Sequence, residues 1–142
     1  MKASASATWT GPWITGEGTI SARSGVVNKA PYSFSSRFEG TPGASPEEFL
    51  AAGYAGCFNQ ALANNFGMNK LEAKSVDTYV DVDLGYDDDR RPTIKGIHVI
   101  VSAKVPGATE EMFLHCANRA KTNCTIAKLL KCEITMEATL LA

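Results

Sequence analysis

The segment from Phe49 to Phe66 constrains the fold most, because it contains no charged residue and the next charge along the chain is Lys70. A strong helix start precedes it. Ser45 suits an N-cap, Pro46 suits the first helical position, and Glu48 completes a capping box. Small residues fill most of positions 51–56, where other backbones could approach closely. A helix without a charged face is expected to be buried, so the sequence predicts a central core helix.

Length and charge then limit the class of protein. The chain has 142 residues, 44% of them hydrophobic, and a formal net charge of −1. One domain over residues 1–142 is expected, with roughly two-thirds of the unfolded surface buried. The small net charge argues against nucleic acid or an anionic membrane as the main partner. No apolar run reaches the roughly 18 residues of a membrane span, and the first residues lack a secretory pattern. We expect a soluble cytoplasmic protein.

Alternating and periodic patterns predict the remaining elements. Strands are expected at Glu17–Ala22, Tyr32–Phe38, Ser75–Tyr86, Thr93–Val105 and Glu133–Leu141. Two further helices are expected, one capped by Thr109 and ending at Lys121, the other from about Cys124 to Lys131. The order of elements predicts an α+β domain in which an antiparallel sheet packs with the buried central helix.

A disulfide framework is not expected, because the chain is long enough to fold without one and shows no export signal. A zinc site is not expected either, because no two cysteines are spaced two to four positions apart. The cysteines lie at positions 57, 116, 124 and 132. Neither a metal nor a cofactor is expected. His98 and His115 are interpreted as structural. In a reducing compartment each cysteine is therefore either a small core residue or a reactive thiol.

Cys57 and Cys124 each have an argument for reactivity. Burial in an apolar helix disfavours the thiolate of Cys57, so a reactive Cys57 needs a nearby cation. Arg37, on the expected strand Tyr32–Phe38, is the candidate, although a solvent-facing arginine is the plainer interpretation. Cys124 would open a helix, where free N–H groups favour a thiolate, although it could equally be a core residue at the cap. Cys116 and Cys132 receive no role.

Three segments together resemble the OsmC/Ohr family of hydroperoxide reductases, and more closely its OsmC branch. They are Arg37-Phe38-Glu39-Gly40, the run from Ser45 to Phe58 that contains Cys57, and Lys121-Thr122-Asn123-Cys124. Their order and spacing make the resemblance specific, and it extends over essentially the whole chain. One departure is Thr125, where many relatives have proline after the second cysteine.

The resemblance implies a thiol peroxidase that reduces organic hydroperoxides and, less well, hydrogen peroxide. Cys57 matches the peroxidatic position, Cys124 the resolving position, Arg37 the activating arginine and Glu47 its carboxylate partner. A Cys57–Cys124 disulfide would form and an external dithiol would reduce it. The resemblance suggests a lipoyl-bearing partner for the Ohr branch and leaves the reductant of this chain open.

The spacing of two of these residues predicts a homodimer. Glu47 and Cys57 are ten positions apart on one predicted helix, about 15 Å along its axis. A glutamate side chain cannot bridge that distance. Either Glu47 acts at Cys57 of a partner subunit, or the helix breaks between them. The intertwined dimers of the resembling family agree with the first alternative.

Two other functions stay open from the sequence. The chain could be a non-catalytic redox switch, in which Cys57–Cys124 oxidation changes the binding of a partner. It could also be a small-molecule binding domain whose thiols have no role. Steady peroxide consumption with a dithiol would favour the enzyme over both.

Overall fold

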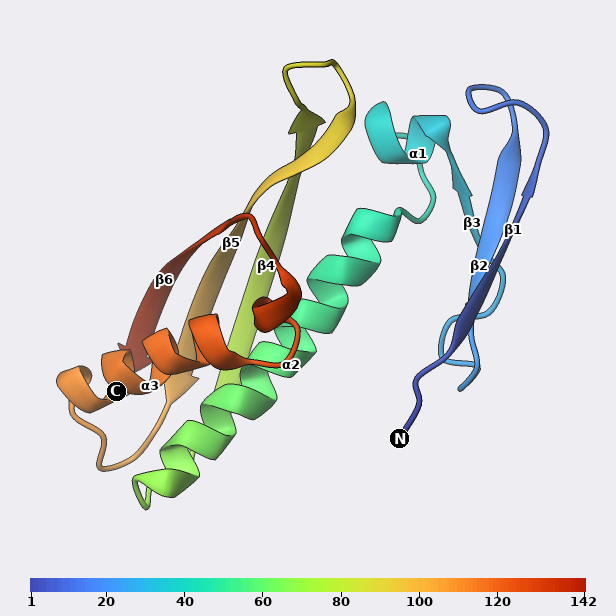
Figure 1. Ribbon diagram of the computed structural model, residues 1–142. Coiled ribbons are helices and arrows are strands. Elements are labelled where there is room, and N and C mark those ends of the chain that lie inside the picture. Colours follow the sequence, from blue (N-terminus) through green and yellow to red (C-terminus); the bar gives the residue numbers. More distant parts are fainter. The chain divides into compact units, whose positions relative to one another are not determined.

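The computed structural model describes all residues, 1–142, and these form two compact units. Unit 1 comprises Met1–Phe49 and unit 2 comprises Leu50–Ala142. Figure 1 shows the elements of each unit in sequence colours.

Unit 1 begins with a three-stranded antiparallel sheet in the order β1-β2-β3. The strands are β1 (Ala5–Thr10), β2 (Glu17–Ala22) and β3 (Ala30–Ser33). The prediction of β2 is confirmed to the residue, whereas of the three strands expected before the long helix the first, β1, had no predicted bounds. All six residues of β1 are exposed, so its sequence carries no inward-facing hydrophobic pattern that would reveal it.

The expected strand Tyr32–Phe38 is wrong in its second half, because the chain turns into a short helix, α1 (Phe34–Phe38). Two serines cause this change of structure. The Ser36 N–H donates to Ser33 Oγ (3.1 Å), and the Ser33 N–H donates to Ser36 Oγ (2.9 Å). This reciprocal capping satisfies N–H groups at the helix start. Arg37 therefore lies on a helix rather than on a strand.

Helix α2 (Pro46–Met68) begins where the sequence predicts, and the Glu48 N–H donates to Ser45 Oγ (3.0 Å). It runs without a break for 23 residues. The expectation that it is buried on all sides is wrong for the single chain. Its large side chains are buried every third or fourth position, whereas several small residues of the other face are exposed. The buried residues are Tyr54, Phe58, Leu62, Asn65 and Phe66, and the exposed small residues include Ala52, Gly53, Gly56 and Ala63.

Unit 2 has a second three-stranded sheet in the order β4-β5-β6. Its strands are β4 (Ser75–Tyr86), β5 (Pro92–Lys104) and β6 (Glu133–Leu141). Strands β4 and β5 are antiparallel, but β5 and β6 are parallel, which corrects the expectation of a wholly antiparallel sheet. A parallel pair needs a long crossover. Helix α3 (Glu110–Asn123) and the 3₁₀ turn η1 (Ala127–Leu129) supply it. The α+β class is confirmed.

The expected helix from Cys124 to Lys131 is reduced to the single turn η1. Leu130 adopts an extended backbone that leads the chain into β6, which leaves no room for a longer helix. The helix capped by Thr109 is confirmed and extends two residues beyond the predicted end at Lys121.

The core of unit 2 lies between the inner face of this sheet and the two long helices. Alternate residues of β5 and the large residues of α2 meet the apolar face of α3 there. The strand faces predicted from alternation are confirmed, since Val99 and Val101 are buried while Ile100 between them is exposed. No helix of the structure is both long enough and apolar enough to cross a membrane.

Candidate functional site

Two of the predicted site residues, Cys57 and Cys124, meet in unit 2. Cys57 lies near the middle of α2 and is half-buried. Cys124 is the C-cap residue of α3 and is buried, with 2% of its surface exposed. The Cys57 thiol lies close enough to Cys124 to raise the pKa of the Cys124 thiol. The fold thus brings together two thiols that are 67 positions apart in the chain.

The environment of Cys124 differs from the one that the sequence suggested. Burial raises the pKa of this thiol above its ordinary value. The Ala127 N–H, which donates to Cys124 Sγ (3.4 Å), lowers the pKa, as the sequence argument expected of a helix start. The nearby Cys57 raises it again. The pKa of Cys124 is therefore raised overall, because the N–H groups of a single turn are too few to offset the loss of solvation on burial.

Tyr54 belongs to the same cluster and was not assigned a role from the sequence. Its side chain is fully buried, and its hydroxyl donates to the Lys121 carbonyl (3.1 Å). Burial, followed by the charges of Cys124, Cys57 and Cys132, raises the pKa of Tyr54. Its position one helical turn before Cys57 is the only signal that could have revealed it. Tyr54 thus ties α2 to the end of α3, where Cys124 lies.

Arg37 and Glu47, the other two predicted site residues, meet in unit 1. Arg37 Nη2 donates to Glu47 Oε1 (2.5 Å), and Arg37 Nε donates to Glu47 Oε2 (3.3 Å). The guanidinium carbon also lies 4.9 Å from the centre of the Phe38 ring. A two-point ion pair with a stacked ring fixes the plane of the guanidinium. The predicted partnership of Arg37 with Glu47 therefore exists in the fold.

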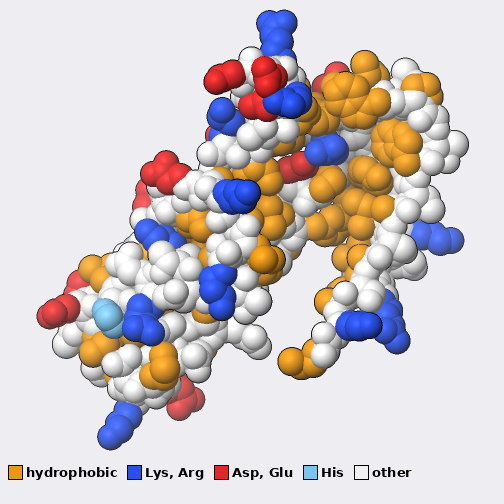
Figure 2. All heavy atoms as spheres, in the orientation of Figure 1, with side chains coloured by type: hydrophobic (Ala, Val, Ile, Leu, Met, Phe, Trp, Pro, Cys, Tyr) orange, Lys and Arg blue, Asp and Glu red, His pale blue; other side chains and the backbone are white.

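Arg37 also lines a pocket of about 300 Å³ in unit 1. The other side chains that form it are mainly aromatic: Trp9, Trp13, Tyr32, Phe34 and Phe38. Figure 2 shows hydrophobic side chains gathered over this part of the chain. On the expected strand Tyr32–Phe38, Arg37 would lie on the opposite face from Phe34 and Phe38. That placement is wrong, because a helical turn puts all three around the same pocket.

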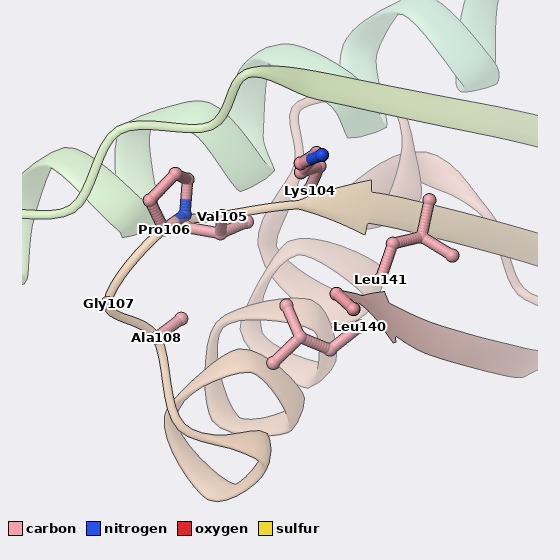
Figure 3. A pocket seen from close by; sticks show the side chains of 8 residues that line it. Lys104, Val105, Pro106, Gly107, Ala108, Leu140 and Leu141 are labelled. Atoms are coloured by element: carbon pink, nitrogen blue, oxygen red, sulfur yellow. The ribbon is translucent and has the colours of Figure 1, made fainter.

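Another pocket, of about 500 Å³, lies in unit 2 where β5 and β6 end. Figure 3 shows Pro106, Leu140 and Leu141 around it, with Lys104 beside them. None of the four predicted site residues lines it. No cluster of three or more His, Cys, Asp or Glu side chains is arranged to hold a metal ion.

Comparisons with known proteins agree with the sequence motifs. Residues 38–139 match the family model described as OsmC-like protein. A curated relative from Escherichia coli (strain K12), Peroxiredoxin OsmC, is 38% identical over 129 residues, which cover 91% of this chain and 90% of the relative. The same figures hold for Peroxiredoxin OsmC of Shigella flexneri.

Solved structures show the same fold. The organic hydroperoxide resistance protein OhrB of Bacillus subtilis is 23% identical and superposes with a TM-score of 0.68, over 97% of this chain and 98% of that one. An OsmC-like protein from Mycoplasma pneumoniae, only 13% identical, superposes with a TM-score of 0.76 over 100% and 99% of the two chains.

Proposed function

Because the chain belongs to the OsmC-like family, we propose that it is a cysteine-based peroxidase that reduces organic hydroperoxides with electrons from a dithiol. The observation that carries this proposal is the proximity of Cys57 to Cys124, since a two-thiol peroxidase needs two sulfur atoms that can bond to each other. Cys116, by contrast, is fully buried beside Asn69. We propose Cys57, Cys124, Arg37 and Glu47 as the working residues of one domain that spans residues 1–142.

In the first step the Cys57 thiolate attacks the terminal oxygen of the hydroperoxide. The O–O bond breaks, the alkoxide takes up a proton and leaves as an alcohol, and Cys57 becomes a sulfenic acid. Arg37 stabilises the thiolate and donates hydrogen bonds to the peroxide oxygens. Glu47 holds the guanidinium in place, and the geometry of the Arg37–Glu47 pair supports this role.

In the second step the Cys124 thiolate attacks the sulfur of the Cys57 sulfenic acid. Hydroxide leaves as water, and a Cys57–Cys124 disulfide forms. An external dithiol then reduces the disulfide by two thiol–disulfide exchanges and is itself oxidised. The balance is one hydroperoxide and one dithiol consumed for one alcohol, one water and one oxidised dithiol. We propose the cytoplasm as the location, because such a cycle requires a supply of reduced dithiols. Whether the dithiol is lipoyl-bearing stays open.

The unbroken helix α2 supports a homodimer with shared sites. Helix α2 is continuous from Pro46 to Met68, which favours this arrangement over a helix broken between Glu47 and Cys57. Ten residues of helix separate the two positions by about 15 Å. Arg37, which binds Glu47, therefore serves Cys57 of the partner subunit in our proposal. The exposed small residues on α2 would let a second copy of the chain approach closely.

Turnover tests the enzymatic proposal directly. The purified protein is given cumene hydroperoxide with dihydrolipoamide, thioredoxin or glutathione as alternative reductants, and peroxide loss is followed. We expect many turnovers per chain with at least one of the dithiols. A single oxidation per chain, with no further peroxide loss whichever reductant is supplied, would instead support a thiol switch.

Complementation between two inactive variants tests the shared site. Arg37→Met and Cys57→Ser chains are co-expressed so that mixed dimers form. If Arg37 acts across the interface, each mixed dimer contains one intact site, and about a quarter of the wild-type activity returns. If Arg37 acts within its own chain, no activity returns, which would contradict the shared site without affecting the peroxidase proposal.

A further inference from the structure

The aromatic pocket beside Arg37 carries an inference about substrate class, which rests on the peroxidase function proposed above. We propose that this pocket binds the organic group of the hydroperoxide, that it favours compact aryl hydroperoxides over long-chain ones, and that Trp13 determines this preference.

The first argument is the composition of the pocket. Five aromatic side chains and Arg37 line it. The Trp13 ring stands edge-on to Phe34, with ring centres 5.1 Å apart and planes at 87°, and it meets Phe38 at 6.3 Å and 78°. Phe34 and Phe38 are 4.8 Å apart. An aryl group bound in this pocket can pack edge-to-face or offset-stacked against these rings, which are the arrangements that aromatic rings prefer.

The second argument is size. The pocket has a volume of about 300 Å³. This value is at the lower end of the range for small-molecule sites, roughly 300–1,000 Å³. A single ring with a short substituent can fill such a pocket, whereas most of a long acyl chain would remain outside in water. Size therefore favours compact organic groups.

Trp13 lies on a turn that is closed by hydrogen bonds, and 58% of its surface is exposed. It lies in the connection between β1 and β2, where the Gly16 N–H donates to the Pro12 carbonyl (2.7 Å) and Trp9 Nε1 donates to the Gly11 carbonyl (2.9 Å). A Cβ at Gly16 would lie 2.5 Å from the Pro12 carbonyl oxygen, so the turn closes only with glycine there. An exposed indole on a tightly closed turn can cover a ligand without a large ordering cost.

The fourth argument is the position of Arg37. Its guanidinium plane is fixed by Glu47 and by the Phe38 ring, and its side chain also lines the pocket. Two of its five N–H groups donate to Glu47, which leaves others for a ligand. A hydroperoxide whose oxygens bind this guanidinium has its organic group next to the aromatic rings.

Tryptophan fluorescence tests the pocket without requiring catalysis, because the chain contains two tryptophans and both line it. The probe is 2-phenyl-2-propanol, the alcohol produced from cumene hydroperoxide, and tert-butanol is the matched probe without a ring. We expect a saturable blue shift with the aryl alcohol, because the ring displaces water from Trp13. The absence of a shift up to the solubility limit, or an equal shift with tert-butanol, would overturn the proposal.

Kinetics test the role of Trp13. In the wild type we expect kcat/KM for cumene hydroperoxide to exceed that for a linoleic acid hydroperoxide. We expect Trp13→Ala to lower the ratio of kcat/KM for cumene hydroperoxide over hydrogen peroxide on the order of tenfold. Ile14→Ala is the control, because Ile14 is the exposed neighbour that does not line the pocket, and it should leave the ratio unchanged.

The two proposals can fail separately. Saturable binding of 2-phenyl-2-propanol without any peroxide turnover would contradict the peroxidase function but would support the binding of an aryl group in the pocket. Turnover with equal kcat/KM for the aryl and linoleic acid hydroperoxides, or an unchanged ratio in Trp13→Ala, would contradict the pocket and keep the peroxidase.

Discussion

Unit 1 positions Arg37 with a short helix and hydrogen bonds, whereas unit 2 positions its thiols with long helices and a hydrophobic core. Arg37 lies on a five-residue helix capped by two serines and is held by Glu47 and one aromatic ring. Cys57 and Cys124 lie on α2 and at the end of α3, against a continuous set of buried side chains.

The difference separates two tasks of the proposed reaction. A thiol that must form a disulfide with one specific partner benefits from a rigid core, because each sulfur then has a fixed position. A charged group that must meet varied substrates benefits from an accessible location with a fixed orientation. We therefore expect substitutions in the two units to affect different steps of the proposed reaction.

Replacing the peroxidatic thiol should have the largest effect. We expect Cys57→Ser to lower dithiol-dependent peroxide turnover on the order of a thousandfold or more, because no other side chain supplies the nucleophile. The measurement is peroxide loss with saturating reductant. Cys116→Ser is the matched control from the same core, since it removes a fully buried thiol that accepts a hydrogen bond from Asn69. Equal losses in both variants would indicate a folding defect rather than a catalytic role.

Removing the cation of unit 1 should have the next largest effect. We expect Arg37→Met to slow sulfenic acid formation on Cys57 by about a hundredfold, because a preorganised donor to the reacting oxygens is lost. A sulfenic-acid probe after a single addition of peroxide measures this rate. Arg23→Met, which removes an exposed arginine of the same unit, should leave the rate unchanged. A normal rate in Arg37→Met would show that unit 2 acts without unit 1.

The rate of the resolving step should depend on pH, because its nucleophile, Cys124, is buried in unit 2. Burial raises the pKa of Cys124, so its thiolate is scarce at neutral pH. Below that raised pKa, each pH unit should increase the rate of disulfide formation about tenfold, and the rise should continue past the ordinary thiol value of about 8.5. Mass spectrometry after one oxidation measures the rate. A plateau already at neutral pH would contradict this expectation.

The smallest effect should come from the cap that holds α1. Ser33→Ala removes the side chain that accepts the Ser36 N–H, and we expect it to destabilise unit 1 by about 1 kcal/mol. Urea unfolding followed by tryptophan fluorescence reports on this unit, because both tryptophans lie in it. Ser4→Ala, in the exposed N-terminal segment, is the control. An unchanged midpoint in Ser33→Ala would contradict a stabilising role for this cap.

The same contrast explains which parts of the fold could be predicted from sequence. Strands β4 and β6 were predicted to the residue because one face of each packs on the core and imposes a strict alternation. The short helix α1 was missed because its signal is the pair Ser33 and Ser36 rather than a hydrophobic period. The parallel pairing of β6 with β5 depends on the long crossover between them, and no local sequence pattern predicts it.

The residues of the candidate site also differ in how far their positions could be predicted from the sequence. The pairing of Arg37 with Glu47 followed from the family resemblance and is present in the fold. The contribution of Trp13 could not be foreseen, because a tryptophan beside proline and glycine has no periodic neighbours that would place it against Phe34. The pKa of Cys124 depends on the burial of one sulfur atom, which is set by residues distant in sequence.

The parallel pairing of β5 with β6 has a consequence for biosynthesis. Cys124 lies within the crossover between these strands, before β6 begins at Glu133. Pairing over such a separation occurs only after the whole strand has left the ribosome. A nascent chain therefore exposes Cys57 to oxidants before the thiol that protects it is in place.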